Sequence, residues 1–258
     1  MLSPGTATSQ LSEVGSYIFR TCLEDSEQGT LIAYFAKNFL KAGRVAIFRE
    51  MTSEYSTDLS NKFKESFTNL DGKIVREVVY KQGQSDFNEQ INTLKTDQID
   101  AIVMPGYFDE ASKLAKALKE NKIRVNLIGG DIWEDSTTKR PKDSPLNGAY
   151  FSSHFHPDNG DPKTKGFVNT FNDKFGSPPQ KFAALGYDAG KIITLALDGL
   201  SEVTPKKIRN RLRKLEPYTG VTGTIAIADS KNATRGGVIL QIKNGQPTFV
   251  TRILPDQN

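Results

Sequence analysis

The strongest constraint on the fold is a regular alternation of short β-branched runs with longer amphipathic stretches between residues 44 and 128. The β-branched runs are 45–48, 74–80, 99–104 and 125–128. The intervening apolar residues recur at helical spacing: Leu59, Phe63, Phe67 and Leu70, then Phe87, Ile91 and Leu94, then Ala111, Leu114, Ala115 and Leu118. This order is typical of βα units, so the sequence predicts an α/β fold with a parallel sheet.

The second half of the chain has a different pattern. Residues 136–145 are polar and contain proline, and residues 148–155 are predicted to form a strand that crosses to another lobe. Three helices (167–175, 183–200 and 205–215) and two further strands (223–228 and 237–242) are expected after it. This block has few strands for its helices to cover, so we expect an apolar helix face to remain exposed. Gly190 is expected to serve close helix packing.

Composition narrows the class of protein. With 258 residues, 37% of them hydrophobic and 25% charged, the chain is expected to be globular rather than disordered. Its 34 basic and 30 acidic residues leave a net charge of +4. The densest basic run, 206–214, has apolar residues at helical intervals, which indicates a solvated helix face. No nucleic acid partner is therefore expected. No apolar run approaches the ~20 residues of a membrane-spanning helix.

Motifs for catalysis, cofactors or metals are incomplete. The glycine pattern at 186–191 is one residue short of a dinucleotide motif, and Ser136–Lys139 lacks the other motifs of serine acylases. Cys22 has no base near it in sequence and is expected to be a buried structural thiol. His154 and His156 alternate on a strand that is expected to be solvent-exposed, without a third ligand. We therefore expect no catalytic residue, no cofactor and no metal.

The segments that follow the four predicted strands hold the best binding candidates. Ligands of open parallel sheets bind beyond the carboxyl ends of the strands. These segments supply Tyr55, Tyr107 and Trp133, which are expected to be exposed, and Asp131 after a glycine pair. Aromatic faces and one carboxylate suit an ammonium group. The alternative is that Asp131 caps a turn while the aromatic side chains cover the sheet edge.

Motifs spread over most of the chain carry a resemblance to a known family. They are 2–5 (Leu-Ser-Pro-Gly), 17–21 (Tyr-Ile-Phe-Arg-Thr), 25–29 (Asp-Ser-Glu-Gln-Gly), 55–56, 86–87, 99–103 with 106–107, 130–133 (Gly-Asp-Ile-Trp), 184–189 and 218–225. In order and spacing the chain resembles the leucine/isoleucine/valine-binding protein family. These proteins are the periplasmic substrate-binding subunits of ABC transporters with the type I periplasmic-binding-protein fold.

The resemblance implies two Rossmann-like lobes that close on a ligand. The first lobe would comprise residues 1–21 and 153–232, and the second residues 22–152 and 233–258. Family members have βα units before the Ser-Pro-Gly loop, so the first lobe is expected to be incomplete. At roughly 30 residues per unit, about 90–120 residues and the export signal would be absent.

The resemblance also implies roles for particular residues. Tyr55 and Tyr107 resemble the aromatic wall of the site, and Asp131 resembles the carboxylate that receives the ligand's ammonium group. Phe182 falls where the family has an aromatic residue near the ligand side chain. The family hydroxyl in the Ser-Pro-Gly loop corresponds to Ala7 here, so the neighbouring Thr6 and Thr8 are the candidates in that loop.

The implied function is capture of an amino acid, or a related amine or amide, for an ABC importer without catalysis. Its partners would be the small ligand and a membrane permease, and the full-length form would be periplasmic or on the extracellular surface. Two alternatives remain open. One is a ligand-sensing domain of a receptor or regulator with the same fold. The other is a Rossmann-like enzyme whose nucleotide motif lies in the absent part.

Overall fold

The computed structural model describes residues 1–8, 11, 14–94, 97–135, 141–227 and 233–254. Its internal contacts divide the chain into two compact units. Among the described residues, unit 1 contains Met1–Glu24, His154–Val238 and 252–254, and unit 2 contains Asp25–Ser153 and Ile239–Thr251. Each unit therefore combines segments that are far apart in the sequence.

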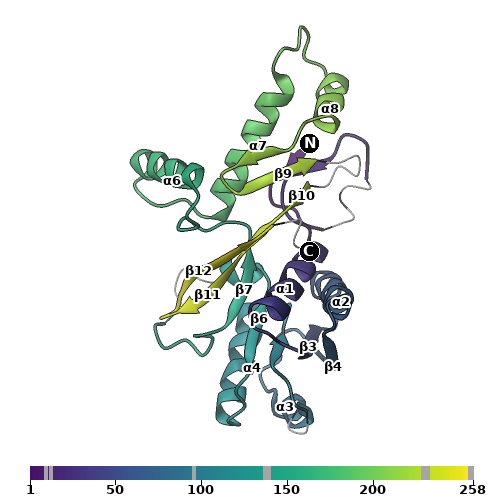
Figure 1. The fold of residues 1–258 in the computed structure, drawn as a ribbon, viewed down its shortest axis with the longest axis vertical. Helices are drawn as coiled ribbons and strands as arrows, with labels where there is room; N and C mark the ends of the chain where they lie inside the picture. Colours follow the sequence, from purple (N-terminus) through teal and green to yellow (C-terminus); the bar gives the residue numbers. More distant parts are fainter. Residues whose placement is uncertain (9–10, 12–13, 95–96, 136–140, 228–232, 255–258) are drawn as a thin grey trace. The chain divides into compact units, whose positions relative to one another are not determined.

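Unit 2 is built on a mainly parallel sheet (Figure 1). The strand order of this seven-stranded sheet is β12-β11-β7-β6-β5-β3-β4. The strands are β3 (Arg44–Glu50), β4 (Lys73–Tyr80), β5 (Ala101–Val103), β6 (Asn126–Gly129), β7 (Tyr150–Ser153), β11 (Gly237–Lys243) and β12 (Gln246–Ile253). The pairs from β4 through β3, β5 and β6 to β7 are all parallel. The predicted parallel α/β arrangement is confirmed.

Helices cover both faces of this sheet because its central strands are apolar on both sides (Figure 1). Helices α1 (Asp25–Asn38) and α2 (Glu54–Asn69) lie on one face, and α3 (Asn88–Leu94) and α4 (Phe108–Glu120) on the other. Side chains alternate along β3: Val45 and Ile47 join the core cluster beneath α1 and α2. Phe48 points the other way and packs on Phe87, with 6.4 Å between ring centroids.

Helices α1 and α2 approach closely at Gly29. A Cβ atom at this position would lie 2.5 Å from the carbonyl oxygen of Leu59 and 2.6 Å from the backbone nitrogen of Phe63. Only glycine permits this approach without moving one helix. The contact sets the position of the amino-terminal turn of α1, which carries a residue of the candidate site.

Unit 1 combines short strands with three helices. The two-residue strands β1 (Leu2–Ser3) and β2 (Phe19–Arg20) pair in parallel, and β8 (Tyr218–Gly220), β9 (Gly223–Ile227) and β10 (Ala233–Arg235) form an antiparallel sheet. The helices are α6 (Pro162–Phe175), α7 (Lys181–Leu197) and α8 (Pro205–Arg213). One side of α7 is buried, whereas Phe182, Tyr187 and Leu195 remain 40–54% exposed. The expected exposed apolar face is confirmed for this helix.

A buried network of charged residues holds unit 1 together. Asp188 is fully buried and accepts the N–H groups of Val221 and Thr222, each at 2.9 Å. Arg235 is also buried and donates to the carbonyl oxygens of Thr21 and Thr222, each at 2.9 Å. Burial lowers the pKa of Arg235 to about 10, against the opposing effect of the Asp188 charge, so the guanidinium stays charged at neutral pH.

The structure confirms the expectation for Cys22 and contradicts those for His154 and Gly190. Cys22 is buried, as predicted, and its thiol donates to the carbonyl oxygen of Thr6 at 3.2 Å. The predicted solvent exposure of His154 is wrong, because this residue is only 4% exposed and lies just beyond the end of β7. The packing role of Gly190 is also wrong, since a Cβ atom there would meet open space. Residues 136–139 lie outside the described part of the chain.

Candidate functional site

Asp131 stands at the carboxyl end of β6 and is held by two polar side chains of unit 2. Its Oδ1 atom accepts a hydrogen bond from Gln28 Nε2 at 3.0 Å and another from the Tyr55 hydroxyl at 3.4 Å. The backbone N–H of Asp131 donates to Gln28 Oε1 at 3.1 Å. Gln28 therefore fixes both the backbone and the carboxylate of Asp131, which orients the carboxylate before any ligand arrives.

Gln28 is a site residue that the sequence reasoning missed. It lies in the first half of α1, is 1% exposed, and also accepts the Ser152 hydroxyl at 2.7 Å. Its sequence neighbours Gly29, Leu31 and Ile32 are buried too. A polar residue on the buried face of an amphipathic helix was the available signal, because such a side chain needs hydrogen-bond partners in the interior.

Tyr55 is the second group that the structure places beside Asp131. Burial, followed by the negative charges of Asp131 and Asp25, raises the pKa of the Tyr55 phenol well above its ordinary value. The phenol therefore keeps its proton and donates a hydrogen bond to the Asp131 carboxylate. A Cβ atom on Gly130 would lie 1.9 Å from the Tyr55 hydroxyl oxygen, so the glycine after β6 makes room for this contact.

Tyr107 and Trp133 occupy different environments. Tyr107 is the N-cap residue of α4 and remains 42% exposed. The expectation that Trp133 is exposed is wrong: it is fully buried in α5 (Ile132–Asp135), and its Nε1 donates to the carbonyl oxygen of Gly106 at 2.8 Å. A Cβ atom on Gly129 would lie 2.2 Å from the indole, so the glycine that ends β6 leaves room for this ring. Of the aromatic residues at the strand ends, Trp133 supports the loop and Tyr107 faces solvent.

Two buried carboxylates support the neighbouring loop between β4 and α3. Glu50 accepts the N–H of Gln82 at 3.1 Å, and Glu110 accepts the N–H of Gly83 at 2.7 Å. Glu50 is 2% exposed and Glu110 is 5% exposed. Burial and the charge of Glu110 raise the pKa of the nearby Tyr80 phenol. The sequence analysis did not single out these two carboxylates. Because they accept backbone N–H groups, they hold the loop between β4 and α3 in place.

The candidates of unit 1 are placed around the loop after β1. Phe182 is the second residue of α7 and is 54% exposed, and a Cβ atom on Gly5 would lie 3.1 Å from its ring. The Ser-Pro-Gly loop therefore rests against Phe182. Thr6 is exposed, and its N–H donates to Ser3 Oγ at 3.1 Å. Thr8 is half-buried, and its carbonyl oxygen accepts a hydrogen bond from the Arg20 guanidinium.

Residues 1–8, 11, 14–94, 97–135, 141–227 and 233–254 contain neither a metal-binding cluster nor a membrane-spanning helix. Within these ranges no group of three or more His, Cys, Asp and Glu side chains is arranged to hold a metal ion. In the same part of the chain, no helix combines the length and the apolar character that crossing a bilayer requires.

Solved structures resemble this chain over nearly its whole length. A leucine binding protein from Thermotoga maritima is 28% identical, with a TM-score of 0.83, and the match covers 100% of this chain and 74% of that protein. A branched-chain amino acid transporter substrate binding protein from Streptococcus pneumoniae, in complex with isoleucine, is 26% identical with a TM-score of 0.79. That match covers 98% of this chain and 72% of the other. The expected type I periplasmic-binding-protein fold is confirmed.

Sequence comparisons give the same result. A Leu/Ile/Val-binding protein homolog from Brucella abortus is 22% identical over 93% of this chain, and the chain spans 64% of the length of that relative. The model of the family described as periplasmic binding protein matches residues 1–247. Because this match takes in almost every element described above, the chain belongs to the periplasmic binding protein family.

Proposed function

We propose that this chain binds an amino acid with an apolar side chain as the solute-binding component of an ABC importer. The observation that carries the proposal is the Asp131 carboxylate, which Gln28 and Tyr55 orient at the carboxyl end of a parallel sheet. The names of the relatives support the ligand class, since one of them is in complex with isoleucine.

The geometry around Asp131 suits an ammonium group. A charge-assisted hydrogen bond between a carboxylate and an ammonium group contributes roughly 1.5–3 kcal/mol. Gln28 and Tyr55 donate to the carboxylate from neutral groups, so they orient the negative charge without cancelling it. The exposed ring of Tyr107 adds an aromatic face at the same edge of the sheet.

Unit 1 contributes the remaining proposed contacts. Phe182 would meet the apolar side chain of the ligand, and its exposure leaves the ring accessible. Thr6 and Thr8 would donate to the ligand carboxylate from the loop after β1, where the hydrogen bond between Thr6 N–H and Ser3 fixes the backbone. Binding would involve no chemical change of the ligand. The proposed partner is a membrane permease, and the proposed location of the working protein is the periplasm or the extracellular surface.

Isothermal titration calorimetry with leucine, isoleucine and valine tests the proposal. Asp131→Asn keeps the size of the side chain but removes its charge, so affinity should fall about 30-fold or more, equivalent to at least about 2 kcal/mol. Asp143→Asn is the matched control, because Asp143 is an exposed acid of unit 2. Equal affinities of Asp131→Asn and the unmodified chain would refute the role of Asp131. No heat of binding with any of the three amino acids would refute the ligand class.

A further inference from the structure

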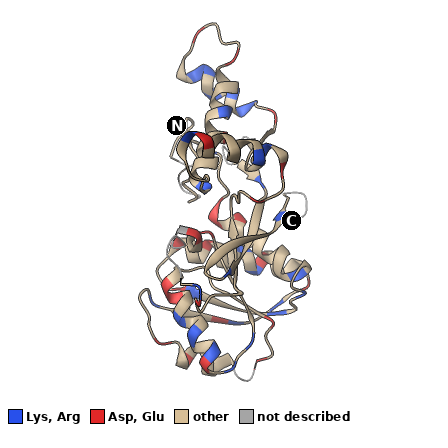
Figure 2. Ribbon diagram, turned by 90° about the vertical axis from the view of Figure 1, so that its left-hand side faces the viewer, with Lys and Arg blue, Asp and Glu red and all other residues tan. Residues whose placement is uncertain are grey.

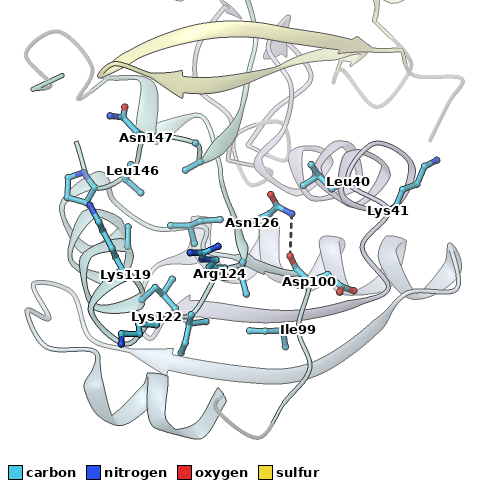
Figure 3. Close-up of a pocket in the computed structure, with 18 residues that line it drawn as sticks. Leu40, Lys41, Ile99, Asp100, Lys119, Lys122, Arg124, Asn126, Leu146 and Asn147 are labelled. Carbon is cyan, nitrogen blue, oxygen red and sulfur yellow. Dashed lines mark hydrogen bonds between the residues drawn. The ribbon is translucent and has the colours of Figure 1, made fainter. Parts of the chain in front are cut away.

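Unit 2 also contains a groove that Leu40, Asp100, Arg124 and Leu146 help to line (Figure 3). Its volume is about 930 Å³. It is lined by residues that precede β5, β6 and β7, together with the last turns of α4. Because these strands are parallel, their amino ends meet at this edge, whereas Asp131 follows the carboxyl end of β6. The groove is therefore separate from the candidate amino-acid site.

Four of the five charged side chains that line the groove are basic. They are Lys41, Lys119, Lys122 and Arg124, and the acid among the lining residues is Asp100. Asp100 Oδ2 accepts the N–H groups of Gly43 and Arg44 at 2.8 and 2.9 Å, so this carboxylate already has partners. None of the four basic side chains forms an ion pair or hydrogen bond with another described residue. The groove thus has an excess of positive charge that the described side chains leave uncompensated.

The carboxyl end of α4 accounts for two of the basic residues in the groove but not for Arg124. Lys119 lies in the last turn of α4 and Lys122 just after it, where the carbonyl groups of a helix favour cations. Arg124 lies farther along the chain, on the approach to β6, and is exposed. Figure 3 shows Arg124 near the middle of the groove, whereas the ammonium group of Lys41 points away from it. The basic groove is therefore defined by Lys119, Lys122 and Arg124.

The shape and chemistry of the basic groove indicate what it would bind. A guanidinium group pairs with phosphate through two parallel hydrogen bonds, and lysines act beside it as mobile point charges. Apolar side chains line the same groove, among them Leu40, Ile99 and Leu146 (Figure 3). We propose that the basic groove binds a small molecule bearing two or more linked phosphate groups. This inference does not depend on the amino-acid ligand proposed above.

Titration calorimetry of the full chain with inorganic tripolyphosphate tests the proposal. We expect saturable binding at one site, at an affinity that leucine does not change. The variant Lys119→Gln/Lys122→Gln/Arg124→Gln should bind at least about tenfold more weakly. The control Lys165→Gln/Lys206→Gln/Lys214→Gln removes three exposed charges from unit 1 and should keep the affinity. A parallel titration with ATP distinguishes the source: tighter binding of ATP would point to an organic phosphate, and equal binding to polyphosphate itself.

A second measurement locates the site without relying on a variant. Acylation of Lys119 and Lys122, followed by mass spectrometry, should slow when tripolyphosphate is present, while acylation of Lys206 should not change. The proposal is overturned if binding does not saturate, or if both triple variants lose the same affinity. It is also overturned if all three lysines are protected equally, because the interaction would then reflect only the net charge of the chain.

Discussion

Gln28 is the residue on which the geometry of Asp131 depends. Gln28→Ala would leave the Asp131 N–H and the Ser152 hydroxyl without their buried acceptor. Unsatisfied buried groups of this kind cost roughly 1–3 kcal/mol each, so we expect the free energy of unfolding to fall by about 2–4 kcal/mol. Urea denaturation measures this loss, and Gln98→Ala, at an exposed glutamine of the same unit, is the control. Similar stability of the two variants would show that the Gln28 bonds carry little energy.

For single residues, the sequence predicted which side chains lie at the strand ends better than it predicted their hydrogen-bond partners. The parallel strand ends indicated that Asp131 and Tyr55 belong to one edge, and the structure brings them within 3.4 Å. The partnership of Gln28 and Asp131 joins residues 103 positions apart, which no local pattern shows. The prediction that Trp133 is exposed was wrong, because a ring that follows a glycine pair can turn into the core. Gly129 leaves the space for this ring. The spacing of residues near a strand end does not reveal whether a side chain there faces the core or solvent.

Among the secondary-structure elements, the packing of α1 on α2 depends on Gly29. Gly29→Ala would place a methyl group 2.5 Å from the Leu59 carbonyl oxygen, so one helix must move. Overpacking of this kind costs about 1–3 kcal/mol, and we expect the midpoint of thermal unfolding to fall. Because Gln28 precedes this glycine, leucine affinity should fall as well.

A matched control for this prediction lies on α7. Gly186 is exposed and a Cβ atom there would meet nothing within 4 Å. Gly186→Ala should therefore stabilise its helix by roughly 0.5–1 kcal/mol, because alanine loses less conformational freedom in a helix. Differential scanning calorimetry should show opposite shifts for the two alanine variants. A stabilising effect of Gly29→Ala would contradict the close approach of α1 and α2.

The outer strand β4 is linked to its neighbours by ion pairs of Glu77. Its carboxylate lies 2.8 Å from Lys64 Nζ on α2 and 3.3 Å from Arg49 Nε on β3. The hydrogen bond from Lys64, with the help of Arg49, lowers the pKa of Glu77 below its ordinary value of 4.5. The ion pairs therefore stabilise the fold above about pH 4.5, and this contribution is lost as the pH falls through the lower folded-state pKa.

Glu77→Gln tests this pH dependence. The side chain is 33% exposed, so solvent screening limits the contribution of the ion pairs to less than about 1 kcal/mol. We expect the variant to be less stable than the unmodified chain at pH 7, and the gap to narrow as the pH is lowered toward 3. Urea denaturation at several pH values measures the gap. A gap that widens in acid would contradict the lowered pKa of Glu77.

Periodicity predicted the elements of unit 2 better than those of unit 1. The four strands and three helices between residues 44 and 129 agree with the prediction because each has a clear apolar pattern. The third strand begins at Ala101 rather than at residue 99, and the Asp100 side chain before it accepts the N–H groups of Gly43 and Arg44. Strands β1 and β2 were missed because two residues are too few to show a period.

On the scale of the whole molecule, charge alone does not select a partner. Figure 2 shows basic and acidic positions interspersed along the ribbon, in keeping with a net charge of +4. Apolar exposure is more uneven: unit 1 leaves Phe175, Leu195 and Val203 between 45% and 63% exposed. Exposed large apolar side chains favour association in water. We therefore expect this chain to associate with itself as its concentration rises.

Sedimentation velocity over a range of concentrations tests self-association. The weight-average mass should rise above the 28.5 kDa of one chain, and Phe175→Lys/Leu195→Lys should hold it near that value. Met51→Lys/Val79→Lys is the control, because it adds the same charge at exposed apolar positions of unit 2. An equal effect of both variants would show that net charge, rather than the apolar side chains of unit 1, governs association. If the unmodified chain keeps the mass of one chain at every concentration, exposure of these side chains does not drive association.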